Sequence, residues 1–248
     1  GALGLGVPGV AYATVIAQAI SAFFCFRKIM KMNEYFDLNK STVKLASNVA
    51  MRIIKIGVPS GITMAIMACA GMVVQTLTNS MGEMIIAANV IIMRVDGFAM
   101  MPNMSFGQAM SVYTGQNVGA MKYDRIPLGT KQGAIIAVGC SAAITGILLV
   151  ANKFLFGIFT DTQELIDLAG RMMRLMAAGY IGVAVTQVLG GVMRGAGDTV
   201  TPMWISIINT VVLRVPLAYI LAYYTKSADF PNGHPYALSI SLLVTWVL

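Results

Sequence analysis

Residues 132–152 read QGAIIAVGCSAAITGILLVAN, without a single Asp, Glu, Lys or Arg. A helix that crosses the hydrocarbon core of a bilayer needs about 20 mostly apolar residues, and this stretch meets both conditions. It does not alternate polar and apolar side chains, as a strand of a membrane barrel would. The stretch therefore predicts a membrane-spanning helix.

The rest of the chain repeats this pattern. Hydrophobic residues make up 57% of the sequence and charged residues 11%, against about 25% charged residues in an average soluble domain. Disordered chains are also excluded, because they are poor in apolar residues. We predict an all-α, polytopic membrane helix bundle with about seven spans. The expected spans, the last of them cut short, are 5–26, 56–80, 84–118, 131–152, 168–193, 201–224 and 235–248.

The basic residues predict how these spans are oriented. Seven of them lie in 27–55, and four more in 119–131 and 194–200, whereas the opposite loops carry only Lys153 and Lys226. Short cytoplasmic loops retain positive charge, so we place 27–55 in the cytoplasm and expect a multi-pass protein of the cell (plasma) membrane. This distribution accounts for the net charge of +7 without nucleic acid. Such a basic stretch can also touch anionic lipid.

Two glycine-containing turns are expected on the cytoplasmic side. They are GQNVGA at 115–120 and RGAGDTVTPM at 194–203. Gly195 and Gly197 permit the positive φ that ends many helices, and Asp198 or Thr199 can accept backbone N–H bonds at the start of the next helix. Neither turn follows a strand or continues into the Lys-Ser/Thr of a phosphate-binding loop.

These residues, together with GVAYATVI at 9–16, resemble the multidrug and toxic compound extrusion (MATE) family of secondary transporters. The resemblance implies two lobes of six helices in the full protein. On that template, 1–26 is the last helix of the N-terminal lobe, 27–55 is a cytoplasmic interlobe linker, and 56–248 is the C-terminal lobe with its last helix truncated. The chain begins with Gly, and we expect a fragment that lacks most of the N-terminal lobe.

The resemblance also implies a function. It is antiport coupled to protons or sodium ions that exports amphipathic, often cationic drugs or toxic compounds, without another cofactor. A flippase of the same superfamily for lipid-linked sugars is the alternative, and it would need a strongly basic cavity. An enzyme would need a cluster of His, Asp or Glu, or a nucleophile–base pair, which the sequence does not offer. Cys25, Cys69 and Cys140 fit no metal motif.

Asp96 is the predicted coupling residue, because it is the one acid well inside a span and such residues are costly there. Asn89 and Asn103 lie seven residues to either side of it and predict a polar stripe. Arg94 is a further candidate for the substrate cavity or polar network, but it is a poor partner for Asp96, since residues two apart do not share a helix face. Asp96 and Arg214 lie at similar depths, about 18 Å and about 15 Å from the outer ends of their helices. We expect them to pair or to share a water network; alternatively, Arg214 bonds backbone carbonyls near Pro216.

One branch of the family carries acids on the first and fourth helices of the second lobe, and this sequence has none in their interiors, which puts a sodium site of that kind in doubt. Coupling then runs through Asp96 or through an acid of the missing lobe. The polar residues of these two helices either line a cavity or join helices. They are Gln75, Asn79, Tyr180 and Gln187.

Several further residues carry expectations of their own. Asp167 and Arg171 are four apart and predict a structural ion pair, while His234 receives no role. Proline kinks helices, and the hinge candidates are Pro59, Pro102 and Pro216. Methionine clusters suit either a promiscuous binding surface or gap-filling in the bundle. They are Met64, Met67 and Met72, and Met100, Met101 and Met104.

Overall fold

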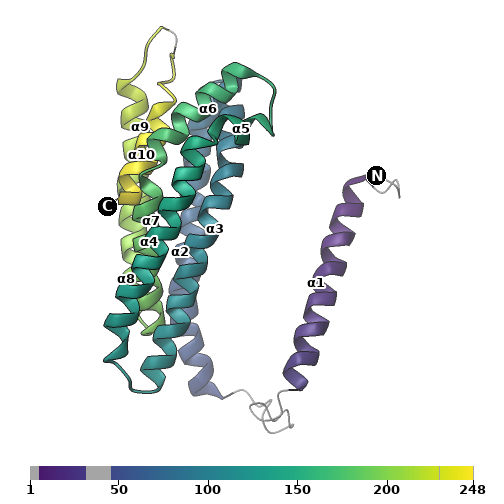
Figure 1. The fold of residues 1–248 in the computed structure, drawn as a ribbon, viewed down its shortest axis with the longest axis vertical. Coiled ribbons are helices and arrows are strands. Elements are labelled where there is room, and N and C mark those ends of the chain that lie inside the picture. The colour runs from purple at the N-terminus through teal and green to yellow at the C-terminus, as the bar shows by residue number, and fades with distance from the viewer. Residues whose placement is uncertain (1–5, 32–45, 229, 248) are drawn as a thin grey trace. The chain divides into compact units, whose positions relative to one another are not determined.

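The computed structural model describes residues 6–31, 46–228 and 230–247, and all of the regular structure in these ranges is helical (Figure 1). The chain divides into two compact units, Gly1–Arg52 and Ile53–Leu248. The helices are α1 (Gly6–Met30), α2 (Ser47–Ser80), α3 (Glu83–Gly119), α4 (Arg125–Val150), α5 (Asn152–Gly157), α6 (Gln163–Met176), α7 (Gly179–Gly195), α8 (Val200–Ile207), the π-helix η1 (Ile208–Arg214), α9 (Val215–Tyr224) and α10 (Tyr236–Val247).

Five helical segments in the described residues are long and apolar enough to cross a membrane, and the bent pair α6–α7 makes a sixth. One of the five is the continuous run Val200–Tyr224, formed by α8, η1 and α9. The predicted all-α membrane bundle is therefore confirmed. The seventh expected span is represented by α10, which at 12 residues is shorter than a crossing requires.

The helix ends extend into the region expected to be a loop. Helix α1 continues to Met30 and α2 begins at Ser47. Arg27, Lys28, Arg52 and Lys55 therefore lie on helix ends, where charged side chains can project beyond the apolar part of a span. The middle of the predicted linker, 32–45, lies outside the described residues. The cytoplasmic placement of the linker and its role between lobes stay predictions.

Helices α3 and α7 pack closely because glycines face each other between them. A Cβ added at Gly191 would overlap the carbonyl oxygen of Gly107, and one at Gly107 would lie 2.9 Å from the carbonyl oxygen of Gln187. Small residues of this kind let the backbones of membrane helices approach one another. The resulting α3–α7 pair is the central packing contact of the second unit.

The turn that follows α7 was predicted correctly in part. Gly197 has φ +92°, and the Asp198 carboxylate accepts backbone N–H bonds from Val200 at 3.2 Å and Thr201 at 3.0 Å. These bonds hold the pKa of Asp198 below its usual value, the Thr201 N–H being the largest cause. Gly195 does not adopt positive φ; it is needed because a Cβ there would overlap the carbonyl oxygen of Ser111 on α3.

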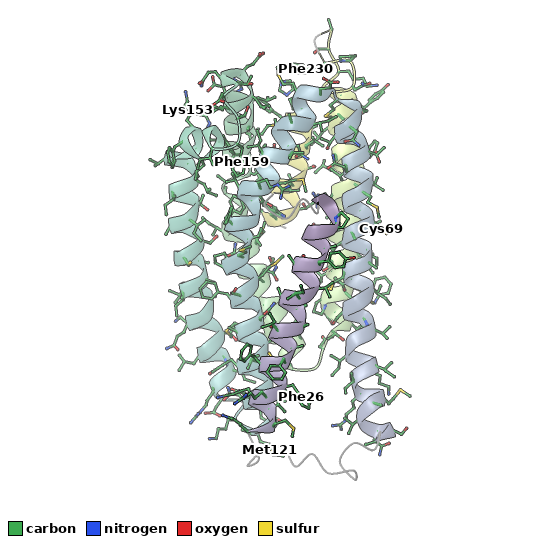
Figure 2. All side chains as sticks on the ribbon, turned by 90° about the vertical axis from the view of Figure 1, so that its right-hand side faces the viewer. Phe26, Cys69, Met121, Lys153, Phe159 and Phe230 are labelled. Carbon is green, nitrogen blue, oxygen red and sulfur yellow. The ribbon has the colours of Figure 1, made fainter. Side chains whose placement is uncertain are left out.

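The charge-based topology agrees with the arrangement of the second unit. Met121, in the α3–α4 turn, lies at one end, and Lys153, Phe159 and Phe230 lie at the other (Figure 2). The contact of Gly195 with Ser111 places the α7–α8 turn at the Met121 end. The basic turns expected on one side of the membrane therefore share one end of this unit.

One local expectation needs correction, and the expected hinges are not tested. Asp167 pairs with Lys153 at 3.4 Å and not with Arg171, because the short helix α5 brings the lysine alongside. Pro59 and Pro102 lie inside unbroken helices. The sharp bend, 49°, lies between α6 and α7, and Pro216 is the second residue of α9, which follows the π-helix. Whether the three prolines act as hinges stays a prediction.

Candidate functional site

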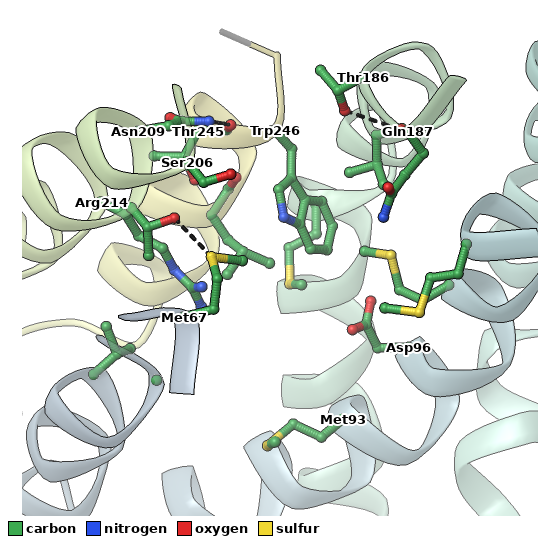
Figure 3. Close-up of a pocket in the computed structure, with 18 of the residues that line it drawn as sticks. Met67, Met93, Asp96, Thr186, Gln187, Ser206, Asn209, Arg214, Thr245 and Trp246 are labelled. Atoms are coloured by element: carbon green, nitrogen blue, oxygen red, sulfur yellow. Dashed lines mark hydrogen bonds between the residues drawn. The ribbon is translucent and has the colours of Figure 1, made fainter. Parts of the chain in front are cut away.

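A cavity of about 510 Å³ opens between α2, α3, α6, α7, α8, η1 and α10 (Figure 3). Its volume lies within the range of about 300–1,000 Å³ that is usual for small-molecule sites. Most of its lining is apolar, and its charged residues are Asp96, Arg194 and Arg214. Within the described residues, no group of three or more His, Cys, Asp or Glu side chains is placed to hold a metal ion.

Asp96 is held in place by Tyr180. The Tyr180 hydroxyl donates to Asp96 Oδ1 at 2.7 Å and lies 3.3 Å from the sulfur of Met173. The ring of Tyr180 is 1% exposed and packs against the Trp246 indole, with 5.2 Å between ring centroids. Its carbonyl oxygen accepts a hydrogen bond from the Ser141 hydroxyl at 2.9 Å. Tyr180 lies just after the α6–α7 bend, so this bend positions the group that orients the carboxylate.

Asp96 and Arg214 do not form the direct ion pair expected from their depths. The one salt bridge among the described residues is Lys153–Asp167. The opposite charges of Asp96 and Arg214 still attract each other electrostatically, and Figure 3 shows both pointing into the cavity from separate helices. The direct partner of Asp96 is Tyr180, and Arg214 Nε is buried without a hydrogen-bond partner. A shared water network stays a prediction.

The structure brings some of the predicted polar residues together in the cavity. Asn89, Gln75 and Gln187 line it with Asp96 and Arg214. Asn79 lies next to the cavity lining and accepts a hydrogen bond from Gln75 Nε2 at 2.8 Å. These amides lie on three helices, α2, α3 and α7, each of which contributes one to the cavity lining.

Other predicted residues lie away from the cavity. Arg94 is exposed on another face of α3 because it lies two residues from Asp96. Asn103 is 1% exposed and both of its amide atoms lack a partner. It falls on the expected face of α3, but one turn further on, at Gly107, this face already touches α7. Tyr180 supports Asp96 from behind the cavity wall.

Sequence reasoning selected Arg214 on the Val200–Tyr224 segment but missed Asn209 and the π-helix that carries both residues. In an α-helix, residues five apart point about 140° away from each other, whereas the i→i+5 bonding of a π-helix brings them close to one face. The π-helix η1 thereby turns both Asn209 and Arg214 into the cavity. Asn209 Nδ2 donates to the Thr245 carbonyl at 2.6 Å and joins η1 to α10.

Arg194 and Trp246 were also missed. Arg194 was assigned to a cytoplasmic loop, but it belongs to the last turn of α7 and its guanidinium lies along Gly190, where a Cβ would be 3.2 Å from Nη1. Trp246 reaches the cavity from the end of α10. The count of charged residues carries no signal for an indole, and the span prediction did not place Arg194 within its helix.

Methionine forms much of the apolar wall. Three of the predicted residues, Met67, Met100 and Met104, line the cavity, whereas Met64, Met72 and Met101 are exposed on the outside of the bundle. Flexible thioethers adapt to ligands of different shapes. The other cavity methionines are Met93, Met172, Met176 and Met193.

The fold and the site together define an integral membrane protein with an adaptable cavity that contains one acid and two arginines. The sequence model of the MatE family matches residues 59–220. The chain therefore belongs to the MatE family.

Individual relatives agree with this assignment. The chain is 26% identical to the probable multidrug resistance protein YoeA of Bacillus subtilis, over 98% of this chain and 53% of the relative. It is 28% identical to the probable multidrug resistance protein NorM of Mannheimia succiniciproducens, over 98% of this chain and 55% of the relative. The chain thus spans about half the length of these two relatives.

A solved structure shows the same fold. It is the outward-facing conformation of a multidrug resistance MATE family transporter, which matches with a TM-score of 0.88 at 18% identity, over 99% of this chain and 54% of the solved chain.

Proposed function

We propose that the complete protein is a secondary antiporter that uses an inward gradient of protons or sodium ions to export amphipathic, often cationic compounds. The observation that carries the proposal is the lone carboxylate of Asp96 in a methionine-lined cavity, oriented by Tyr180. The curated relatives, which are named as multidrug resistance proteins, support the substrate class. The proposed location is the plasma membrane.

The chemistry of the site favours exchange. A carboxylate can attract a cationic substrate or can be neutralised by a proton or a sodium ion, but it cannot serve both fully at the same time. A transporter couples two ligands when each biases the same conformational equilibrium through its differential affinity for the two states. Asp96 provides one group that both cations would compete for.

Its surroundings make that competition sensitive to charge. Electrostatic interactions strengthen where water is excluded, and Asp96 is only partly exposed among apolar side chains. The two arginines give the cavity a basic component, but the acid and the methionine wall do not form the strongly basic lining that a pyrophosphate carrier would need. The first lobe of the complete protein would supply the facing wall of the transport pathway.

Transport in vesicles tests this proposal. The complete protein is reconstituted into liposomes, and uptake of a fluorescent cationic dye is followed under an imposed proton or sodium gradient. Asp96→Asn preserves the shape of the side chain and should lower gradient-driven transport by about tenfold or more, because a fixed neutral amide cannot exchange one cation for another. Asp124→Asn, which changes an exposed acid in the α3–α4 turn, is the matched control and should transport normally. Equal gradient-driven rates for wild type and Asp96→Asn would contradict the proposal.

A further inference from the structure

Arg214 has unused binding capacity. Its side chain lines the cavity, its Nε is buried without a hydrogen-bond partner, and its attraction to Asp96 acts across the cavity without a salt bridge. A guanidinium carries five N–H donors in a planar fork that matches a carboxylate. A buried donor left without a partner is costly. This arginine is therefore prepared for an acceptor that enters the cavity.

A second unpartnered group lies on the same wall. Ser239 on α10 is 1% exposed, lines the cavity, and its hydroxyl has no hydrogen-bond partner. The Asn209–Thr245 hydrogen bond fixes the alignment of η1 with α10. From that bond, Arg214 lies five residues along η1 and Ser239 six residues along α10, both toward the end of the unit that carries Phe230. The two open donors therefore lie at similar heights.

The opposite wall provides the complementary charge. Asp96 points into the cavity from α3, and Gln187 lines it from α7 (Figure 3). The Trp246 indole lies between the two walls and offers an aromatic face to a ligand that spans them. The cavity is therefore acidic on one side, basic on the other, and apolar between.

We propose that Arg214 and Ser239 form a carboxylate subsite, and that the cavity takes amphipathic zwitterions whose cationic end lies at Asp96 and whose carboxylate lies at Arg214. The inference rests on the proposed function and narrows its substrate class. Tyr180 contacts Asp96 and so marks the position of Asp96 along α7. Arg194 lies 14 residues further along this helix, about 21 Å away, and therefore does not join the subsite. One guanidinium neutralises one carboxylate, whereas a doubly charged phosphate bound to it would keep an excess negative charge.

A matched pair of dyes tests the subsite. The probes are a zwitterionic xanthene dye with a free carboxylate and the methyl ester of the same dye, which is a simple cation. Equilibrium binding to the complete detergent-solubilised protein is followed by fluorescence polarisation. Arg214→Gln should weaken binding of the zwitterion by about 10- to 100-fold, the usual worth of a hydrogen bond to a charged group, and should change binding of the ester by less than about threefold.

Control variants separate this effect from misfolding. Arg94→Gln removes an exposed arginine outside the cavity and should leave both dissociation constants unchanged. Ser239→Ala should weaken binding of the zwitterion alone, by about three- to tenfold. If Arg214→Gln does not fold, this variant tests the carboxylate subsite in its place. Equal weakening of both dyes, or of neither, in the folded variants would overturn the carboxylate subsite.

Asp96→Asn distinguishes the subsite from the function on which it rests. This variant should weaken both dyes, because both carry the cationic group. If it does so while Arg214→Gln and Ser239→Ala do not discriminate between the dyes, the subsite is rejected and the proposed cation site stands. If the folded wild type binds neither dye, the proposed function and the subsite are both rejected.

Discussion

At the scale of single residues, the scarcity of charge identifies Asp96 but not its surroundings. An acid inside a membrane span is costly, so the sequence alone marks Asp96 as a candidate functional residue. Its hydrogen-bond donor, Tyr180, lies 84 residues away on another helix. No spacing rule connects the two, because their contact depends on the α6–α7 bend. From the sequence, Tyr180 either lines a cavity or joins helices, and in the structure its hydroxyl donates to Asp96.

The Tyr180 hydroxyl should contribute measurably to stability. Tyr180→Phe retains the ring against Trp246 but leaves Asp96 without this donor. A hydrogen bond to a charged group contributes about 1.5–3 kcal/mol, so the free energy of unfolding in detergent should fall by roughly this amount. Tyr223→Phe, at an exposed tyrosine whose ring contact with Lys226 is retained, is the control. An equal loss in both variants would show that the Asp96 contact is not responsible.

The loop between α9 and α10 should lose stability in mild acid because of His234. Its ring lies between those of Phe230 and Tyr236, with centroid distances of 4.6 and 4.2 Å. Burial, followed by the charge of Arg171, lowers the pKa of His234 below 6.5. The unfolded chain then binds a proton more readily than the folded one, so the stabilisation is present above about pH 6.5 and is lost as pH falls toward the folded pKa.

Thermal unfolding measured at about pH 8 and about pH 5.5 checks this sign. The midpoint of the wild type should fall more between the two pH values than that of His234→Gln, which has no titrating ring. An identical pH dependence in both proteins would show that His234 is not the group responsible.

At the scale of elements, the sequence predicts the helices better than their irregularities. The stretches without charged residues locate the spans, because a helix that crosses a bilayer needs about 20 mostly apolar residues. The π-helix at Ile208–Arg214 and the bend after Met176 have no such signature. The bend contains no proline that would mark it in the sequence. Both irregularities position cavity residues, which is why the site was harder to predict than the fold.

The α3–α7 contact should tolerate no added methyl group. Gly191→Ala would drive a Cβ into the carbonyl oxygen of Gly107, where neither backbone can move without separating the helices. Overpacking of this kind usually costs about 1–3 kcal/mol, which should appear as a lower free energy of unfolding. Gly139→Ala, on α4 with nothing within 4 Å of the new Cβ, should be neutral or slightly stabilising. Similar destabilisation in both variants would contradict a specific α3–α7 contact.

At the scale of the whole molecule, composition and a few turns predict the class and the family, whereas the cavity requires the assembled bundle. Its lining comes from helices spread between α2 and α10, and only the fold brings them together. The chain corresponds to about half of the relatives it matches. The account of transport therefore extends to the complete protein as a proposal. In that proposal, the lining of this cavity forms one wall of the transport pathway and the first lobe forms the other.

The central claim is that coupling cation and substrate compete for Asp96. Binding of a fluorescent cationic amphiphile to the complete protein, titrated against increasing proton or sodium concentration, tests it most directly. For the wild type, the apparent dissociation constant of the dye should rise as the coupling cation rises, because one carboxylate cannot hold both. For Asp96→Asn, the dye should bind more weakly and its affinity should not respond to that cation. An undiminished response to the cation in Asp96→Asn would contradict the claim and move the competition to another residue.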